Sequence, residues 1–209
     1  MSPDVTRVWL ADDAAGCRSI QSLFSWYQSL ETKGKLFGYF VNGPKSWLIL
    51  NSPSFQEEAE SVFGGIVNIT PEGKRHLGAV IGTDAYKEEY CGKIVEDWVD
   101  QLKTLSEIAK SQQQAAYSAY TKGFKSKYTY FMRTIENFEN FVGPVDDIVS
   151  TSLLPAFFGL DTPFDENFRS LLLSPNEGGL GVSILAKETP KQFESSTLVS
   201  RIHVKSILD

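Results

Sequence analysis

The stretch VWLADDAAG, residues 8–16, runs from apolar residues directly into two adjacent aspartates and then into small residues. The preceding residues, VTRVWLA over 5–11, predict a strand that ends at Asp12 and Asp13. Two neighbouring carboxylates repel each other unless a cation lies between them. On a regular strand they would point to opposite faces, whereas a tight turn would let both reach one divalent ion such as Mg²⁺. The pair is therefore a candidate metal site.

A plainer interpretation of the aspartate pair stays open beside the metal site. Asp13 would cap the helix that is expected after it, and Asp12 would only be exposed to solvent.

The overall composition is that of a folded protein rather than a disordered one. The chain has 209 residues, of which 42% are hydrophobic and 22% charged, with a net charge of −6. Cys17 and Cys91 lie far apart and form no CxxC pair, which predicts reduced thiols and an intracellular location in cytoplasm or nucleus. The sequence contains no signal peptide and no apolar run long enough to span a membrane.

Apolar spacing predicts a mixed first part and a helical second part. In the first part we expect a helix over 17–33, a strand over 47–50, a helix over 52–62, and two paired strands over 66–70 and 76–82. From residue 83 onward we expect helices only: a long one that Thr83 or Asp84 caps, a second over 112–135 and a third over 138–157 that Pro144 and Pro155-Gly159 delimit. The predicted fold class is α+β.

One segment of this acidic chain is locally basic. No acid lies between Glu107 and Glu136, and the cations there are Lys110, Lys122, Lys125, Lys127 and Arg133. Such a segment can meet phosphates without reading a nucleotide sequence. Aromatic side chains interleave with the cations, and packing in the core is a better interpretation of most of them than base stacking: Tyr117, Tyr120, Phe124, Tyr128 and Tyr130.

Two protein families resemble parts of this pattern. Residues 7–30 resemble the start of a phosphoryl-accepting receiver domain, in which paired acids precede an amphipathic helix. That family needs a further aspartate at the end of a later strand, and none occurs between residues 14 and 83. The receiver interpretation therefore fails.

The second resemblance covers nearly the whole chain. VWLADDAAG resembles the apolar-Ala-Asp-Asp turn of reverse transcriptases, with Leu10 where many of them carry an aromatic residue. Three further blocks come after it in the expected order: GYFVNGPKSWLIL at 38–50, the primer-grip hairpin HLGAVIG at 76–82, and LLLSPNEGGLGVSIL at 171–185, in which Ser174-Pro175 replaces Leu-Pro. Together with EGKRHLGAVIG and SEIAKSQQQAAY as whole phrases, they are similar to retrotransposon reverse transcriptases of the DIRS-like kind.

The resemblance implies a domain plan. Residues 1–82 would be a partial polymerase palm, with a short antiparallel sheet and two helices. Residues 83–160 would be a helical thumb, and 161–209 a C-terminal extension with the GGLG block at 178–181.

It also implies roles for single residues. Asp12 and Asp13 would be metal ligands for two Mg²⁺ ions in nucleotidyl transfer, and Lys45 would neutralise or protonate the leaving pyrophosphate. His76, Leu77 and Gly78 would belong to the primer grip, and the basic segment to a thumb that binds nucleic acid. An exposed turn lysine explains Lys45 about as well, and a plain hairpin glycine explains Gly78.

The chain departs from the family at its start. The third catalytic aspartate belongs to a strand upstream of the aspartate turn, and only eleven residues precede Asp12. We therefore expect a fragment of an RNA-directed DNA polymerase that is inactive alone. Its partners in the complete enzyme would be a template-primer duplex and deoxynucleotides, with no membrane. The alternatives are a non-catalytic nucleic-acid-binding or interaction module, and a helical protein with no selected function.

Overall fold

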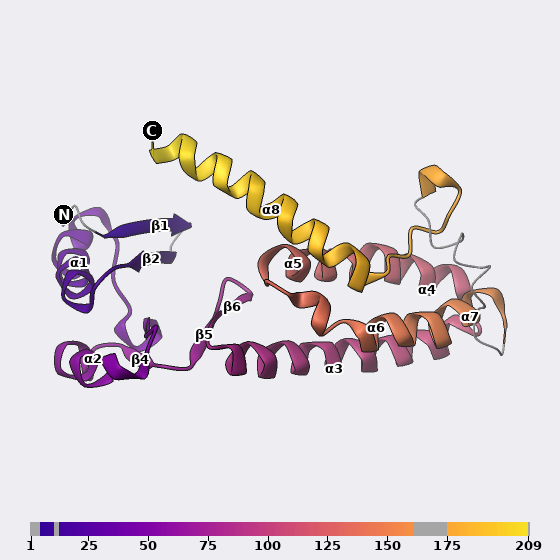
Figure 1. The fold of residues 1–209 in the computed structure, drawn as a ribbon, viewed down its shortest axis with the longest axis horizontal. Coiled ribbons are helices and arrows are strands. Elements are labelled where there is room, and N and C mark those ends of the chain that lie inside the picture. The colour runs from indigo at the N-terminus through magenta and orange to yellow at the C-terminus, as the bar shows by residue number, and fades with distance from the viewer. Residues whose placement is uncertain (1–4, 11–12, 161–174, 209) are drawn as a thin grey trace. The chain divides into compact units, whose positions relative to one another are not determined.

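The computed structural model describes residues 5–10, 13–160 and 175–208, and its described strands all lie between Thr6 and Gly82 (Figure 1). The chain divides into two compact units, Met1–Lys87 and Glu88–Asp209. The predicted α+β class is confirmed. The palm, thumb and extension labels stay predictions.

The first unit contains six short strands and two helices. Its strands are β1 (Thr6–Leu10), β2 (Asp13–Cys17), β3 (Trp47–Ile49), β4 (Asn68–Thr70), β5 (Gly73–His76) and β6 (Ala79–Gly82), and its helices are α1 (Ile20–Lys33) and α2 (Gln56–Phe63). The helices confirm the amphipathic spacing, and 3-10 turns at Gly34–Phe37 and Pro53–Phe55 extend the helical stretches.

The strands form three separate two-stranded ladders among the described residues, and this corrects two predictions. The strand at 66–70 does not pair with 76–82: β4 pairs in parallel with β3, whereas β5 and β6 pair with each other as a separate hairpin. Because α2 connects β3 to β4, the chain has the crossover that a parallel pair requires. The expected short antiparallel sheet is therefore correct for the β1–β2 and β5–β6 ladders and wrong for β3–β4.

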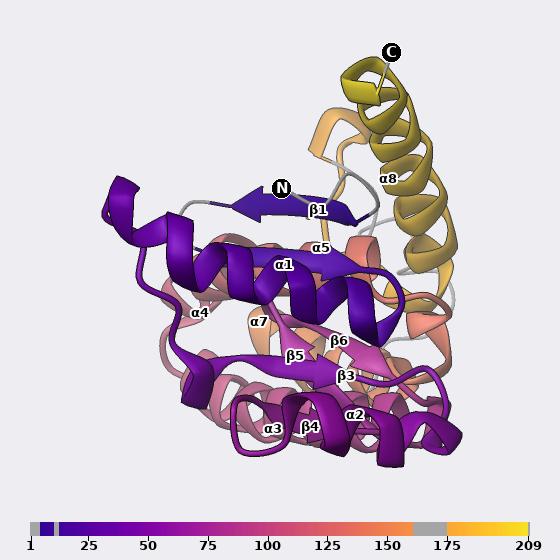
Figure 2. The same ribbon diagram turned by 90° about the vertical axis from the view of Figure 1, so that its left-hand side faces the viewer.

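The core of the first unit lies where α1, α2 and β3 meet (Figure 2). Ile20 of α1, Leu48 of β3 and Phe63 of α2 are buried there together. The rings of Phe24 and Phe63 meet edge to face at 5.2 Å between centroids, an arrangement that aromatic pairs favour.

The second unit is built from helices. They are α3 (Asp84–Ala109, which begins in the first unit), α4 (Gln113–Ala119), α5 (Lys125–Thr134), α6 (Gly143–Ile148), α7 (Leu154–Phe158) and α8 (Leu185–Leu208). A π-helical turn at Tyr120–Phe124 joins α4 to α5, and a second one at Val149–Leu153 joins α6 to α7. The second π turn directly precedes Leu154-Pro155, and the missing N–H of this proline would interrupt a regular α-helix.

Aromatic rings fill the core of the second unit. Trp98 of α3 meets Tyr128 and Phe131 of α5 at centroid distances of 4.8 and 5.1 Å. Phe138, which has no exposed surface, closes the cluster from the 3-10 turn after α5. Of the five aromatics of the basic segment, Tyr120 and Tyr128 are buried, Tyr117 and Phe124 are half-buried with ring contacts to Phe157 and Tyr120, and Tyr130 is 39% exposed.

The helix α8 was not predicted. Its first turn is capped from a distance: the carboxylate of Asp146, on α6, accepts hydrogen bonds from the backbone N–H groups of Leu185 (2.8 Å) and Ala186 (2.9 Å). Burial raises the pKa of Asp146, and the two backbone hydrogen bonds oppose that shift only in part. Figure 1 shows α8 passing α5 and extending beyond it.

Candidate metal turn and nucleic-acid interface

A hairpin carries the aspartate turn. The strands β1 and β2 are antiparallel, and their register pairs Leu10 with Asp13 and Thr6 with Cys17. The chain therefore reverses direction between Leu10 and Asp13, as the metal interpretation requires. Asp13 is exposed, and Asp12 lies outside the described residues.

The capping interpretation of Asp13 is wrong. Helix α1 begins at Ile20, not at Cys17, and its N-cap residue is Ser19. Asp13 is separated from that helix by the remainder of β2. Its carboxylate is therefore not part of a helix cap.

The hairpin is held against α1 by a close contact at Gly16. A Cβ atom on Gly16 would lie 2.7 Å from Cζ3 of Trp26 and 3.1 Å from Cγ1 of Val5, and both of these side chains are buried. Only a glycine allows β2 to approach the indole this closely. At the other strand, the ring of Trp9 meets the ring of Tyr39 edge to face at 5.3 Å.

The magnesium site stays a prediction. No group of three histidine, cysteine, aspartate or glutamate side chains in the described part of the chain is placed to hold a metal ion. Of the two predicted ligands, only Asp13 is described, and a single exposed carboxylate does not make a Mg²⁺ site.

Lys45 ends a tightly bonded 3-10 turn, Gly43–Lys45. The side chain of Asn42 accepts a hydrogen bond from the backbone N–H of Lys45 at 3.2 Å, and Asn68 of β4 donates to the carbonyl of Pro44 at 2.8 Å. Lys45 is exposed and forms no ion pair with Asp13. The fold fixes the backbone of this lysine but does not bring its side chain to Asp13.

The predicted primer-grip block is a hairpin whose tip lies at its second and third residues. His76 ends β5, Ala79 begins β6, and the two connecting residues both adopt left-handed conformations: φ is +49° at Leu77 and +87° at Gly78. Such two-residue turns match the twist of a hairpin, and they favour asparagine and glycine. Leucine is therefore an unusual occupant of the first position, and its side chain is 47% exposed.

The hairpin is anchored to β3 by a cation–π contact. The ammonium nitrogen of Lys74, on β5, lies 3.7 Å from the ring centroid of Trp47, on β3. His76 itself is half-buried. The β5–β6 hairpin, which contains the predicted block, is therefore joined to β3 within the first unit.

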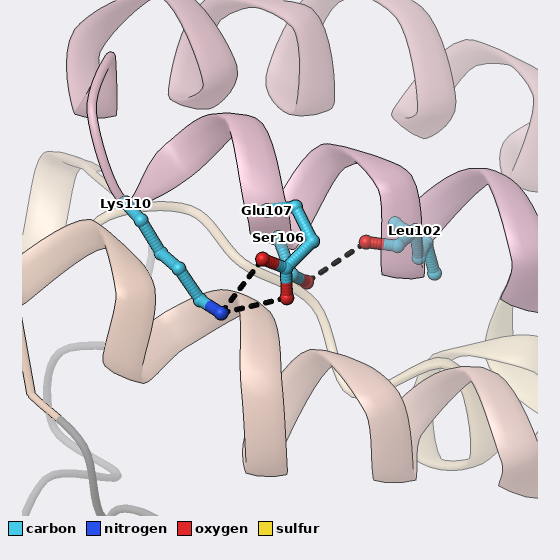
Figure 3. A network of polar contacts seen from close by, with 4 residues as sticks. All are labelled: Leu102, Ser106, Glu107 and Lys110. Atoms are coloured by element: carbon cyan, nitrogen blue, oxygen red, sulfur yellow. Dashed lines mark hydrogen bonds and ion pairs between the residues drawn. The ribbon is translucent and has the colours of Figure 1, made fainter.

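The predicted basic segment does not form a single charged face. Figure 3 shows that Lys110 is paired with Glu107, one turn back on α3, with both carboxylate oxygens at 2.7 Å. Lys127 bonds to Gln101 of α3 and lies 5.3 Å from the ring centroid of Phe124. The Nε of Arg133 donates a hydrogen bond to the side chain of Gln192, on α8, at 2.8 Å. The side chains of Lys122 and Lys125 form no ion pair among the described residues.

The GGLG block serves as a turn that leads into α8. Gly178 and Gly181 both have positive φ, at +82° and +67°. The carbonyl of Leu180 accepts a hydrogen bond from the hydroxyl of Tyr117 at 2.6 Å, which ties the block to α4. The first residues of the wider motif, up to position 174, lie outside the described residues.

Sequence reasoning missed the cations of α8. Arg201 and Lys205 are exposed on the second half of this helix. Their spacing of four residues was the available signal, because it places both on one helix face. Pro190, inside the helix, masked the periodic pattern.

Two observations, one on the cysteines and one on the helices, relate to the expected intracellular location. Cys17 is exposed, Cys91 is buried, and neither forms a disulfide bond. Within the described ranges, no helix has the length and apolarity that crossing a bilayer demands. No protein-family model, curated protein or solved structure matches this chain.

Proposed function

We propose that this chain is part of a retrotransposon RNA-directed DNA polymerase, to which it contributes an aspartate turn and duplex-binding helices, and that it is inactive by itself. One observation carries the proposal: the antiparallel β1–β2 hairpin reverses between Leu10 and Asp13, within the motif that resembles the catalytic turn. A turn is the arrangement in which adjacent carboxylates can serve one metal region.

Primer extension tests the enzymatic part. The chain is incubated with Mg²⁺, deoxynucleotides and an RNA template annealed to a DNA primer, and no extension is expected. Extension by the chain alone would contradict the claim that it is inactive.

Metal contact at the turn is measured separately with Mn²⁺, a paramagnetic ion with similar oxygen-ligand preferences to Mg²⁺. We expect line broadening of the backbone amide resonances around Asp13, and its loss in Asp13→Asn. Asp84→Asn is the matched control, because Asp84 lies in the same unit but is paired with Lys87. If Mn²⁺ broadens the resonances around Asp13 equally in both variants, the assignment of a metal site to this turn is wrong.

A second candidate function is nucleic-acid binding without chemistry, favoured by three lysines of the basic segment that form no ion pair among the described residues: Lys122, Lys125 and Lys127. Each phosphate contact adds about 0.9 to the slope of log affinity against log salt. Lys122→Ala, Lys125→Ala and Lys127→Ala together should lower this slope for an RNA–DNA duplex.

The control for that experiment removes the same charge from paired lysines. Lys93, Lys103 and Lys110 each form an ion pair with an acid on α3: Glu89, Asp100 and Glu107. Their triple alanine variant should leave the slope almost unchanged. If the triple alanine variant of Lys122, Lys125 and Lys127 keeps the wild-type salt slope, the thumb-like role of the basic segment is wrong.

A further inference from the structure

A groove runs between the end of α5 and the second half of α8. Its volume is about 570 Å³. One side is formed by Arg133 of α5, and the other by residues of α8: Ser196, Thr197, Ser200, Arg201, Val204 and Lys205. This surface was not predicted from the sequence, and only Arg133 belongs to the basic segment.

The charge in the groove has one sign. Three of its described lining residues are cations and none is acidic, although the whole chain carries a net charge of −6. Arg201 and Lys205 form no ion pair within the described ranges. The groove is therefore a local positive surface on an acidic protein, and such a surface attracts anions.

Arg133 lines the groove and is held by one hydrogen bond to α8. Its Nε donates to the side-chain oxygen of Gln192 at 2.8 Å, and this bond fixes the plane of the guanidinium group. Its two terminal nitrogens have no hydrogen-bond partner among the described residues. They remain available as a fork of donors, which suits phosphate oxygens.

The α8 side of the groove is a regular array. Its six residues lie at positions 196, 197, 200, 201, 204 and 205, so they occupy one stripe of the helix. From Ser196 to Lys205 the stripe is about 14 Å long, at about 1.5 Å per residue. Along the axis of a duplex, where one strand carries a phosphate about every 3.4 Å, that length corresponds to about four phosphates.

We propose that this α5–α8 groove binds the phosphodiester backbone of a nucleic acid, with Arg133, Arg201 and Lys205 as charge contacts and the hydroxyls as hydrogen-bond donors. The proposal rests on the proposed nucleic-acid-binding function. Contacts to phosphates carry no nucleotide sequence information, so the proposed contact is one to the backbone of the duplex.

The test compares two doubly substituted variants of the full chain. Arg201→Ala/Lys205→Ala removes two charges from the groove. Lys187→Ala/Lys191→Ala removes two charges from exposed positions on the same helix, outside the groove. Circular dichroism checks that both variants keep the helix content, which is expected because all four side chains are exposed.

Binding to a fluorescently labelled RNA–DNA duplex is measured by anisotropy over a series of salt concentrations. The groove variant should lower the salt slope by about 1.8, at about 0.9 for each lost contact, and the control should leave it unchanged. A wild-type slope in the groove variant, or an equal loss in the control, overturns the proposal.

Two further results separate the groove from the wider function. If the groove variant binds like wild type while the Lys122, Lys125 and Lys127 variant loses slope, the function stands and the groove assignment fails. If wild-type protein does not bind the duplex at all, both fail. Tripolyphosphate is the second probe: a site that binds it, but not the duplex, takes free polyphosphate, and this also overturns the proposal.

Discussion

The two units of the chain keep their large apolar side chains in different places. In the second unit, rings from α3 and α5 and from the turn after α5 bury one another, and Phe138 has no exposed surface. In the first unit, the segment after α1 leaves Leu36, Phe37 and Phe40 at 80%, 87% and 70% exposure. The second unit also exposes apolar side chains, at 52–60%, but they lie on α8 and not among these rings: Leu198, Val199, Ile202 and Val204. The first unit has its own buried core, but it exposes the rings that directly follow α1.

Loss of a ring from the closed core should have the greatest effect on stability. Phe138→Ala should lower the free energy of unfolding of the second unit by about 3–5 kcal/mol, because it removes a buried ring and leaves a cavity among packed aromatics. Phe37→Ala is the matched control and should change stability by less than about 0.5 kcal/mol, because its ring is already in solvent. Urea denaturation followed by circular dichroism measures both. Similar losses in the two variants would erase the contrast between the units.

A more modest loss is expected where the first unit relies on a close approach. Gly16→Ala should cost about 1–3 kcal/mol, because the added methyl would lie against the ring of Trp26 and force the hairpin away from α1. Gly92→Ala is the control: it lies within α3, where an added Cβ meets nothing within 4 Å. There alanine should stabilise by about 0.5–1 kcal/mol, since it favours the helix. If Gly16→Ala is neutral in denaturation, the hairpin does not need this contact.

The long-range cap of α8 should contribute about 1 kcal/mol, a typical cost of losing a capping carboxylate. Asp146→Ala removes the acceptor of two backbone hydrogen bonds at Leu185 and Ala186. Ser150→Ala, one turn further along the same helical stretch, is an exposed control. The stability of both variants is measured by thermal denaturation, and equal melting temperatures would show that the cap contributes nothing.

The pH dependence of that cap has a defined sign. Because burial raises the pKa of Asp146, the folded chain binds this proton more tightly than the unfolded chain. The stability that the folded chain gains from binding this proton is therefore fully present below a pH of about 4. It is lost as the pH rises through the folded pKa of Asp146. Wild type should gain stability relative to Asp146→Asn on acidification, which denaturation at several pH values measures. A relative loss would mean that the backbone hydrogen bonds outweigh burial.

The smallest change in stability is expected for a substitution at the tip of the β5–β6 hairpin. Leu77→Asn should stabilise the first unit by up to about 1 kcal/mol in urea denaturation, because asparagine tolerates the left-handed conformation that leucine adopts there. Gly78→Ala is the opposite change at the neighbouring position and should destabilise. A loss of stability in Leu77→Asn would show that the exposed leucine makes a contact worth more than its backbone strain.

Helical periodicity predicted α1 and α3 well, because their apolar residues recur at spacings of three and four. Strand pairing was harder. The segment DAAGC lacks the branched and aromatic residues that favour strands, and it becomes β2 only because β1 pairs with it. Similarly, β4 looks the same in sequence whether it pairs with β3 or with β6, since the choice depends on where α2 packs.

Around the candidate site, local turns were predictable from the sequence, but the pairing of its cations was not. The turn at the aspartates and the hairpin at Leu77-Gly78 arise from local sequence. The local sequence does not determine which partner a cation has. Lys110 is neutralised by Glu107, one turn away, and Arg133 is bonded to Gln192, which lies 59 positions later. A segment without acids is therefore not the same as an unpaired charged surface.

The cap of α8 also predicts an order of events in folding. Its acceptor, Asp146, lies 39 positions before its donor at Leu185, so the bond closes a long loop and gains nothing until α6 is already in place. Docking of α8 onto α5 should therefore come after the assembly of α3 and α5 around Trp98. In a pulse-labelling experiment, amide hydrogens of α8 should acquire protection from exchange last, and the groove beside Arg133 would be the final surface to form.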